Sequence, residues 1–365
     1  MIASSSLSEV DSEKEDQVSP MLGSRLHGKS FALSPVLCQP SVLSHGSRGR
    51  CGSFPLNLPS NNSPEKSPRK STISRPQNAI RNYSSFSIIG TINGITKNHN
   101  QDDYLIMPQF CDRDTRHLFG VFDGNGEFGH MVSSYIKEKL PYNLEVILDT
   151  ETNMSNALKQ AFLQTNEELL QLENVNFNSS GSTGIIVLLE GNSLFCAYLG
   201  DSKAILGRKE GNKIKPIQMT REHKPSLPEE KSRIESCGGR VEPILDENGN
   251  RNGQDRVWFK YEKFPGLAFS RNFGHKASTR IGIVAEPEVY VYELDVEDEY
   301  IIIGTDGLWE FIPNDEALQL MQNFISSSEL EKSAENLCFE SYRRWKANTS
   351  HSDDITAVIL DISAK

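Results

Sequence analysis

The sequence predicts an α+β fold in which two antiparallel sheets pack face to face between helix pairs, a four-layer α-β-β-α sandwich. The first observation is the order of the segments: strands, two helices, many strands, two helices and one closing strand. The second is that consecutive strands are joined by short turns, which favours antiparallel pairing. A dinucleotide-binding fold is not supported, because no GxGxxG motif follows a predicted strand.

The individual elements are predicted from periodicity and from turn residues. Short apolar runs bounded by turns predict strands, and apolar residues at helical spacing predict helices. Pro141 is a position where the first helix could break. Residues 240–285 are rich in Gly and Asn and are expected to be irregular. The strands are expected at 86–92, 104–107, 118–122, 185–189, 193–199, 203–207, 289–294, 300–304 and 355–362, and the helices at 130–148, 156–172, 228–237, 313–326 and 328–347.

The first 82 residues differ in composition from the rest of the chain. They are rich in Ser and Pro and have little periodic apolar pattern, so they cannot bury enough apolar surface to offset the entropy of ordering. We therefore divide the chain into a disordered tail, 1–82, and a folded domain, 83–365. Ser63 and Ser67 precede prolines and lie beside basic residues, which suggests regulation by proline-directed kinases; an inert tail is the alternative.

The charge of the chain is unevenly distributed. Residues 1–82 hold 10 Lys/Arg and 6 Asp/Glu, against 38 and 49 in the whole chain, so the remaining residues hold 28 and 43. An acidic domain argues against nucleic acid as the main ligand and fits a domain that gathers cations. The six cysteines form no CxxC pair, which is typical of a reducing compartment rather than of a disulfide scaffold or a zinc site.

The sequence also bears on location. No stretch approaches the ~18 apolar residues of a membrane span. The N-terminus has no secretory apolar region, and Ile2 stands where N-myristoylation needs a glycine. We expect a soluble monomer without membrane contact in the cytoplasm, the nucleus or both, and the basic residues near 66–70 are a weak nuclear-import signal.

Four aspartates, Asp123, Asp201, Asp306 and Asp353, each lie at or beside the end of a predicted apolar strand. If those strands are neighbours, the carboxylates converge, and their repulsion is relieved by protons or cations. Oxygen-only ligands without a Cys/His cluster select hard ions such as Mg²⁺ or Mn²⁺. The alternative is that these are ordinary turn aspartates, because Asp is common at strand ends.

The order of motifs resembles that of the metal-dependent serine/threonine protein phosphatases, the type 2C family. The match runs from about Tyr83 to Ser363. Single motifs are weak evidence, but ten in family order are specific. They are Asn100-Gln-Asp102, Phe122-Asp-Gly-Asn-Gly126, Gly181-Ser-Thr183, Gly200-Asp-Ser202, Glu222-His-Lys-Pro225, Arg233-Ile234 with Gly238-Gly239, Leu267-Ala-Phe-Ser-Arg271, Glu286-Pro-Glu288, Thr305-Asp-Gly-Leu-Trp309 and Ser352-Asp-Asp-Ile-Thr356.

The resemblance implies a binuclear Mg²⁺/Mn²⁺ site at one end of the sandwich and hydrolysis of phosphoserine and phosphothreonine in phosphoprotein substrates. A metal-bridging water would attack the phosphate, without a phosphoenzyme intermediate. The implied roles are a bridging ligand (Asp123), a carbonyl ligand (Gly124), ligands of the second ion (Asp306, Asp353), a weaker third site (Asp201 with Asp306), water-mediated contacts (Gln101, Asp102) and a phosphate contact (Lys97).

Three departures from the family pattern stand out. Asn125 replaces the usual His of Asp-Gly-His-Gly, which is assigned as proton donor to the leaving group or organiser of water. Asn can donate a hydrogen bond but cannot supply a proton at neutral pH, and loss of a general acid costs about 10²–10⁴-fold. His275 replaces the Asp of Ser-Arg-x-Phe-Gly-Asp, where it could order its loop or partly replace the acid. Glu310 replaces an Asp that often follows Trp309, a mild change.

Two functions follow from these residues. Retention of Asp123, Asp306 and Asp353 favours an active but slow phosphatase with Asn125 in the catalytic site. Asn125 and His275 favour the alternative, a metal-binding pseudophosphatase that binds phosphoproteins or a kinase as a regulatory module.

Overall fold

The computed structural model describes residues 80–172, 177–326 and 330–364. The predicted tail, 1–82, with Ser63 and Ser67, lies almost entirely outside these described residues. No helix within the described residues is long and apolar enough to cross a membrane.

Two antiparallel sheets form the centre of the domain. The first has the strand order β1-β17-β16-β9-β10, and the second has the order β15-β8-β7-β5, with β4 beside β5 and the short β6 and β14 at its end. The bounds in the first sheet are Asn82–Ile88, Ile355–Asp361, Asp298–Gly304, Lys203–Glu210 and Lys213–Gln218. In the second they are Glu288–Glu293, Ser193–Leu199, Gly184–Glu190, Arg116–Asn125, Asp102–Met107, Gly181–Ser182 and Phe273–Gly274.

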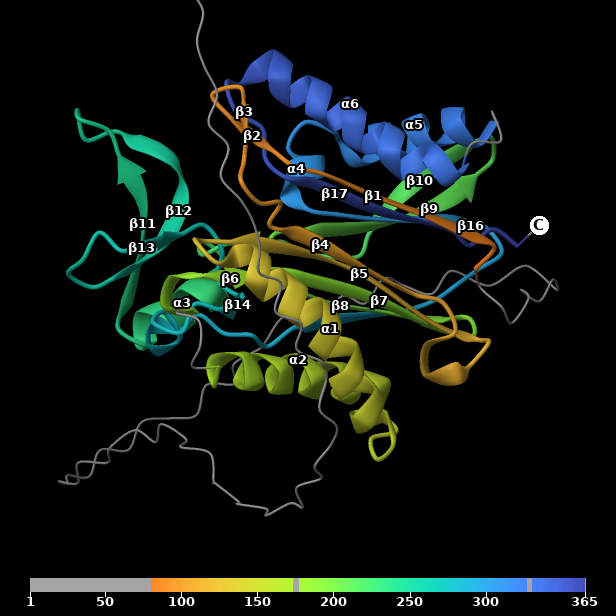
Figure 1. The fold of residues 1–365 in the computed structure, drawn as a ribbon, viewed down its shortest axis with the longest axis horizontal. Coiled ribbons are helices and arrows are strands. Elements are labelled where there is room, and N and C mark those ends of the chain that lie inside the picture. Colours follow the sequence, from red (N-terminus) through yellow and green to blue (C-terminus); the bar gives the residue numbers. More distant parts are fainter. Residues whose placement is uncertain (1–79, 173–176, 327–329, 365) are drawn as a thin grey trace, which may run out of the picture. The chain divides into compact units, whose positions relative to one another are not determined.

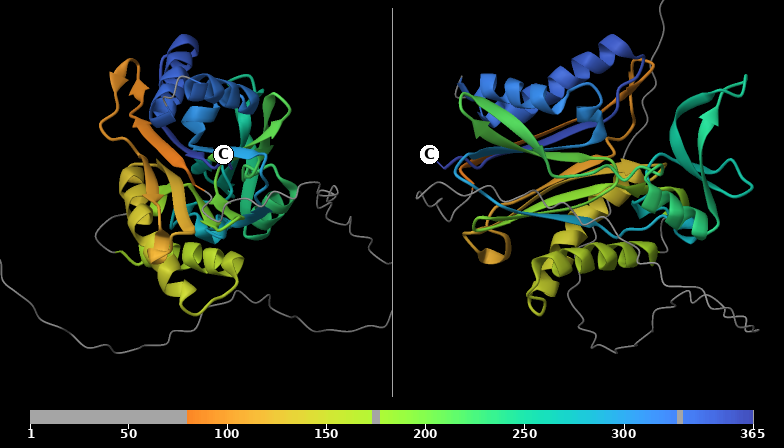
Figure 2. Two further views of the ribbon diagram at one scale, coloured as in Figure 1. Left: turned by 90° about the vertical axis from the view of Figure 1, so that its right-hand side faces the viewer. Right: turned by 180° about the vertical axis from the view of Figure 1, so that it is seen from behind.

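Helix pairs cover the outer faces of both sheets, so the predicted four layers are confirmed (Figure 1). Helices α1 (Gly129–Leu148) and α2 (Met154–Leu170) cover the second sheet, and α5 (Asn314–Ser326) and α6 (Ser333–Asn348) cover the first. The turned views of Figure 2 show the same stacking, with the two sheets between the two helix layers.

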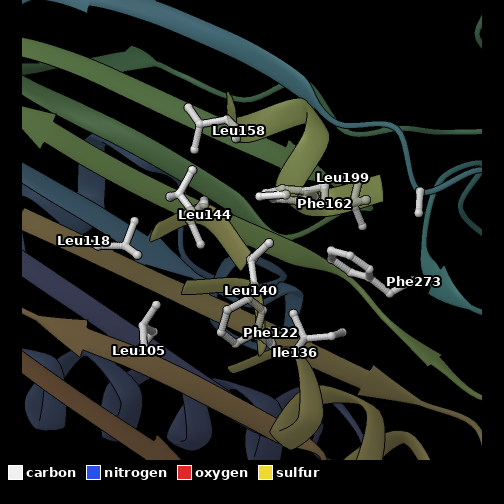
Figure 3. Close-up of a cluster of buried hydrophobic side chains, with 14 of the residues drawn as sticks. Leu105, Leu118, Phe122, Ile136, Leu140, Leu144, Leu158, Phe162, Leu199 and Phe273 are labelled. Carbon is white, nitrogen blue, oxygen red and sulfur yellow. The ribbon is translucent and has the colours of Figure 1, made fainter. Parts of the chain in front are cut away.

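Strand β5 shows why its sequence is continuously apolar. Phe119 and Val121 point into the layer between the sheets, whereas Leu118 and Phe122 pack against the helices, and all four are fully buried. A strand covered on both faces loses the usual polar alternation. Figure 3 shows Leu118 and Phe122 among side chains of α1 and α2. Burying each such side chain contributes about 1.5–3 kcal/mol to stability.

Helix α1 continues through Pro141, so the break considered there does not occur. A proline inside a helix removes one hydrogen bond and costs about 3 kcal/mol. Ile136, Leu140 and Leu144 are fully buried on either side of it, and their packing outweighs that cost.

Residues 240–285 are not irregular throughout, which corrects the sequence-based expectation. Strands β11 (Gly239–Leu245), β12 (Arg251–Phe259) and β13 (Pro265–Leu267) form a separate antiparallel sheet beside α3 (Pro228–Ser236). The β11–β12 pairing shifts register after Pro243. Much of this hairpin is exposed on both faces, so its sequence lacks the apolar run that identifies a strand. The strand expected at 86–92 is divided between β1 and β2 (Thr91–Ile92), and β2 forms a hairpin with β3 (Ile95–Thr96). Strands β3 and β10 were not expected.

Candidate metal centre

The four predicted aspartates come from both sheets at one end of the sandwich. Asp123 lies near the end of β5, which continues past the predicted boundary to Asn125, and Asp201 lies in the β8–β9 turn. Asp306 begins the short helix α4 (Asp306–Trp309), directly after β16, and Asp353 precedes β17. In Figure 1 these strand ends lie on the side of the sandwich that carries β11 and β12.

Electrostatics shows that the carboxylates lie close enough to affect one another. Burial, followed by the charges of Asp306, Asp102, Asp353 and Asp201, raises the pKa of Asp123 well above its usual range. Burial, followed by the charges of Asp201 and Asp353, raises the pKa of Asp306 to about 7. Crowded carboxylates of this kind are stabilised by protons or by cations. The cluster therefore favours binding of a positive ion.

The donor set fits a hard divalent cation. Among the described residues, Asp306 Oδ1 is buried without a hydrogen-bond partner, so one carboxylate oxygen is free for another ligand. Within the same residues, no three Cys, His, Asp or Glu side chains surround a single point closely enough to hold an ion alone. Ions that keep several waters, as Mg²⁺ does, do not require such an all-protein cage.

Lys97 forms an ion pair at this end of the sandwich. Its Nζ lies 2.7 Å from Asp353 Oδ1 and 3.4 Å from Asp354 Oδ2. Burial alone would lower the pKa of Lys97, but the charge of Asp353, with that of Asp354, gives a net increase. The ammonium of Lys97 therefore competes with any cation for Asp353. The sequence of the loop alone did not reveal this ion pair between Lys97 and Asp353.

Asp354 follows Asp353 in the last motif, and it connects the loops around the site. Its side chain is buried and accepts hydrogen bonds from the backbone N–H groups of Gly90 (2.6 Å) and Gln101 (3.0 Å). The adjacency of two acidic residues before a buried strand was the only available signal. Asp354 thus connects the start of β17 to the segments that precede β2 and β4.

Gln101, Asp102 and Gly124 surround Asp123. Asp102 is directly opposite Asp123 in the β4–β5 pairing and accepts a 2.8 Å hydrogen bond from Thr305 Oγ1. Gln101 Nε2 donates to the Gly126 carbonyl at 2.6 Å. A Cβ on Gly124 would lie 2.4 Å from the Gly129 carbonyl oxygen, so only glycine fits there. Their roles toward a metal stay predictions.

Lys224 was missed as a member of the cluster. Its Nζ lies 3.3 Å from Asp201 Oδ2 and 3.1 Å from Glu222 Oε2. The side chain of the preceding His223 is fully buried, and its Nδ1 accepts a 3.1 Å hydrogen bond from the Gly200 N–H. Lys224 and Asp201 therefore both lie next to residues that are joined by this bond.

The two marked departures from the family pattern are in direct contact. His275 Nε2 lies 2.6 Å from Asn125 Oδ1, although the residues are 150 positions apart. The sequence offers His275 as a partial replacement for the acid lost at Asn125 but does not place the two side chains in contact, because nothing local connects them. Glu310, the third departure, is exposed just after α4.

Comparison with known proteins identifies the family of this chain. The family model described as protein phosphatase 2C matches residues 93–351. The chain is 35% identical over 286 residues to probable protein phosphatase 2C 72 of Arabidopsis thaliana, covering 74% of this chain and 83% of that protein. It is 33% identical over 279 residues to probable protein phosphatase 2C 64 of Oryza sativa subsp. japonica, covering 74% and 64% respectively.

A solved structure shows the same fold. The crystal structure of serine-threonine phosphatase 2C from Toxoplasma gondii matches with a TM-score of 0.68 and 23% identity, covering 79% of this chain and 97% of that one. Fold and site together define a helix-flanked β-sandwich with a carboxylate cluster at one end. The chain belongs to the protein phosphatase 2C family.

Proposed function

We propose that this protein is a Mg²⁺- or Mn²⁺-dependent phosphatase of phosphoserine and phosphothreonine whose activity is reduced by Asn125. The observation that carries the proposal is the cluster of Asp123, Asp201, Asp306 and Asp353 at one end of the sandwich. A folded chain gains no stability from crowding partly buried carboxylates unless a cation or proton neutralises them.

Each carboxylate has a proposed position in the site. Divalent ions bound there would supply a water of lowered pKa and neutralise phosphoryl oxygens. Asp123 would bridge two ions, with the Gly124 carbonyl on one of them, while Asp306 and Asp353 would hold the other. Asp201 with Asp306 would form a weaker third site, with Lys224 supplying positive charge when that site is empty.

Lys97, Gln101 and Asp102 would support the reaction. Lys97 lies beside Asp353, so its ammonium can contact a phosphoryl oxygen after leaving its ion pair. Lysine would serve there as a point charge, without the two-pronged geometry of arginine. Gln101 and Asp102 would act on the metal ions through bound waters.

Asn125 limits the departure of the leaving group. The leaving oxygen of serine or threonine is strongly basic and benefits from a proton donor, and an amide cannot supply that proton. We therefore expect slow hydrolysis of phosphoserine and phosphothreonine and a smaller deficit for an aryl phosphate, whose leaving oxygen is stable as an anion.

The alternative function is that of a pseudophosphatase. The observation that favours it is the joint loss of the usual His and Asp, which here are Asn125 and His275 in contact with each other. Such a protein would bind metal and phosphoproteins without turnover. For either function we propose phosphorylated proteins as partners, a monomeric state, and the cytoplasm or nucleus as the location.

A turnover assay tests the proposal. Purified protein with Mn²⁺ would be given an aryl phosphate and a phosphothreonine peptide, beside the variants Asp306→Asn and Asn125→His and the double variant Asn125→His/His275→Asp. We expect Mn²⁺-dependent turnover of the aryl phosphate by the native protein, loss of at least about 10²-fold in Asp306→Asn, and the largest gain on the peptide in the double variant.

Asp149→Asn is the matched control, because Asp149 is exposed at the end of α1, far along the chain from the cluster, and the charge change is the same. It should keep native turnover. No turnover of either substrate by the native protein, by Asn125→His or by the double variant would refute the phosphatase and support the alternative.

A further inference from the structure

The contact between Asn125 and His275 is an unusual feature of the metal-centre rim. The Asn125 Oδ1 and His275 Nε2 atoms are 2.6 Å apart. His275 is 3% exposed, whereas Asn125 is partly exposed beside Asp123 and the glycine-rich turn. A buried side chain thus holds the side chain of Asn125, which by strand alternation lies on the same face of β5 as Asp123.

The backbone of His275 is held firmly. Its N–H donates to the Ser180 carbonyl at 2.8 Å, and its carbonyl accepts from the Ser278 N–H at 2.7 Å. Its φ of 44° lies in the left-handed region, where His, Asn and Asp are tolerated better than other residues with a Cβ. The position of the ring is therefore set by the fold and not by the contact with Asn125.

The surroundings of the ring are equally restrictive. A Cβ on Gly181 would lie 2.5 Å from His275 Cδ2, so a glycine there leaves room for the imidazole. The Phe269 ring lies 5.7 Å from it, centroid to centroid. With Gly181 on one side and Phe269 on another, the imidazole has little freedom to swing away from Asn125.

The direction of the hydrogen bond follows from the chemistry of both groups. An amide oxygen can only accept, so His275 Nε2 must carry the proton and donate. His275 Nδ1 is then a lone pair, buried without a partner among the described residues. The reverse arrangement, with the Asn125 amide flipped, would bury an unsatisfied N–H at Nδ1, and an unpaired buried donor is costly.

The imidazole is also neutral. Burial lowers the pKa of His275 to about 4, so at neutral pH the ring carries no proton that it could give up as an acid. The expectation that His275 could partly replace the missing proton donor is therefore not supported by its surroundings. What remains available to the ring is a fixed hydrogen bond to Asn125.

We propose that His275 is a positioning residue: by donating to Asn125 Oδ1, it turns the amide NH₂ of Asn125 toward the phosphate, where it donates to the leaving oxygen. This rests on the proposed phosphatase function. The bond from phosphorus to the leaving oxygen breaks with its electron pair on that oxygen. The attacking water gives up one proton to solvent and its oxygen becomes part of the released phosphate, while the leaving oxygen takes a proton from solvent. The substrates favoured are those whose leaving oxygen needs a hydrogen bond more than a proton.

The first test compares two substitutions of similar size, His275→Gln and His275→Leu. Glutamine Nε2 can donate from nearly the same place, and leucine cannot, while both carry a Cβ in the same left-handed backbone. For an aryl phosphate with Mn²⁺, we expect kcat to fall about five- to tenfold in His275→Leu and to stay within about twofold in His275→Gln, with KM nearly unchanged in both. Equal losses in the two variants, or a loss confined to KM, would overturn the positioning role.

The second test needs no activity, and its first readout is made on the native protein. In protein labelled with ¹⁵N at histidine, the His275 resonances should report a neutral ring protonated at Nε2 from pH 8 down to about pH 5.5. The Nε2 resonance should shift in Asn125→Ala, which removes its acceptor. A ring protonated at Nδ1, or a charged ring at pH 7, would overturn the proposal.

The two tests distinguish a failure of the proposed phosphatase function from a failure of the positioning role of His275. If the native protein turns over no substrate while the ring is neutral and protonated at Nε2 and responds to Asn125→Ala, the phosphatase function fails and the contact stands. If turnover is Mn²⁺-dependent but His275→Leu equals His275→Gln, the phosphatase stands and the positioning role fails.

Discussion

Ionisation of the Asp306 side chain is unfavourable in the folded protein. Asp306 is the first residue of α4, its Oδ1 is buried without a partner among the described residues, and its pKa is raised to about 7 by burial and by Asp201 and Asp353. A carboxyl whose pKa is higher in the folded state destabilises the fold as pH rises through that value. Without a cation, Asp306 therefore costs stability at pH 8.

The variant Asp306→Asn tests this cost. Replacing the charge by a neutral amide should raise the unfolding free energy of the metal-free protein at pH 8 by roughly 1–3 kcal/mol. Mn²⁺ at about 100 times its Kd should stabilise the native protein by about 2.7 kcal/mol and stabilise the variant much less. Thermal unfolding with and without chelator measures both.

Asp149→Asn is the control, because it carries the same change at an exposed position. It should alter neither the unfolding free energy of the metal-free protein nor the stabilisation by Mn²⁺ by more than about 0.5 kcal/mol. If Asp306→Asn lowers metal-free stability, or keeps the full response to Mn²⁺, the carboxylate is a structural group and not a metal ligand.

At the scale of elements, α3 is tied to the segment between β13 and β14 by one buried acid. The Glu230 side chain is fully buried, and Arg233 and Arg271 each reach it at 2.7 Å. Ser270 Oγ also donates to it. Burial alone would raise the pKa of Glu230, but these partners lower it to about 2.

The variant Glu230→Gln should be destabilised by roughly 3–5 kcal/mol at pH 7, because two arginines lose their buried counter-charge. A carboxyl whose folded pKa lies below its unfolded value stabilises the fold above the unfolded value, near pH 4.5, and loses that effect as pH falls toward 2. The difference between the native chain and Glu230→Gln should therefore shrink between pH 4.5 and 2.

Chemical unfolding of both chains across that range measures the difference. Glu229→Gln is the matched control, since Glu229 precedes Glu230 on the same helix, is exposed, and forms its ion pair with a different arginine, Arg221. A difference between native and Glu230→Gln that stays constant with pH would show that the carboxyl charge of Glu230 is not what holds α3.

Elements differ in how well sequence predicts them. The strand β16, with Ile301, Ile302 and Ile303 all fully buried, was predictable because burial on both faces leaves a continuous apolar run. The hairpin of β11 and β12 was not, because strands exposed on both faces carry no such run. The contact of Asn125 with His275 was not predictable either, since it depends on where the loop after β14 lies in the folded chain.

At the scale of the whole molecule, the sandwich explains why the site could be located from sequence. The ends of β5, β8 and β16 and the start of β17 meet at one end of two packed sheets, so aspartates far apart in the chain share one location. The loops that hold Lys97 and Lys224 against these aspartates follow no such periodicity. Their contacts depend on tertiary structure and were found only there.

The central claim is that this end of the sandwich binds divalent cations through its aspartates. Calorimetric titration of Mn²⁺ into the native protein at pH 8 tests it most directly, with Asp123→Asn and the control Asp149→Asn alongside. We predict at least two ions per native chain, an unchanged stoichiometry in Asp149→Asn, and loss of at least one ion in Asp123→Asn, since in the proposed site Asp123 would contact both ions. Absence of Mn²⁺ binding by the native chain, or identical binding by Asp123→Asn, would contradict the account.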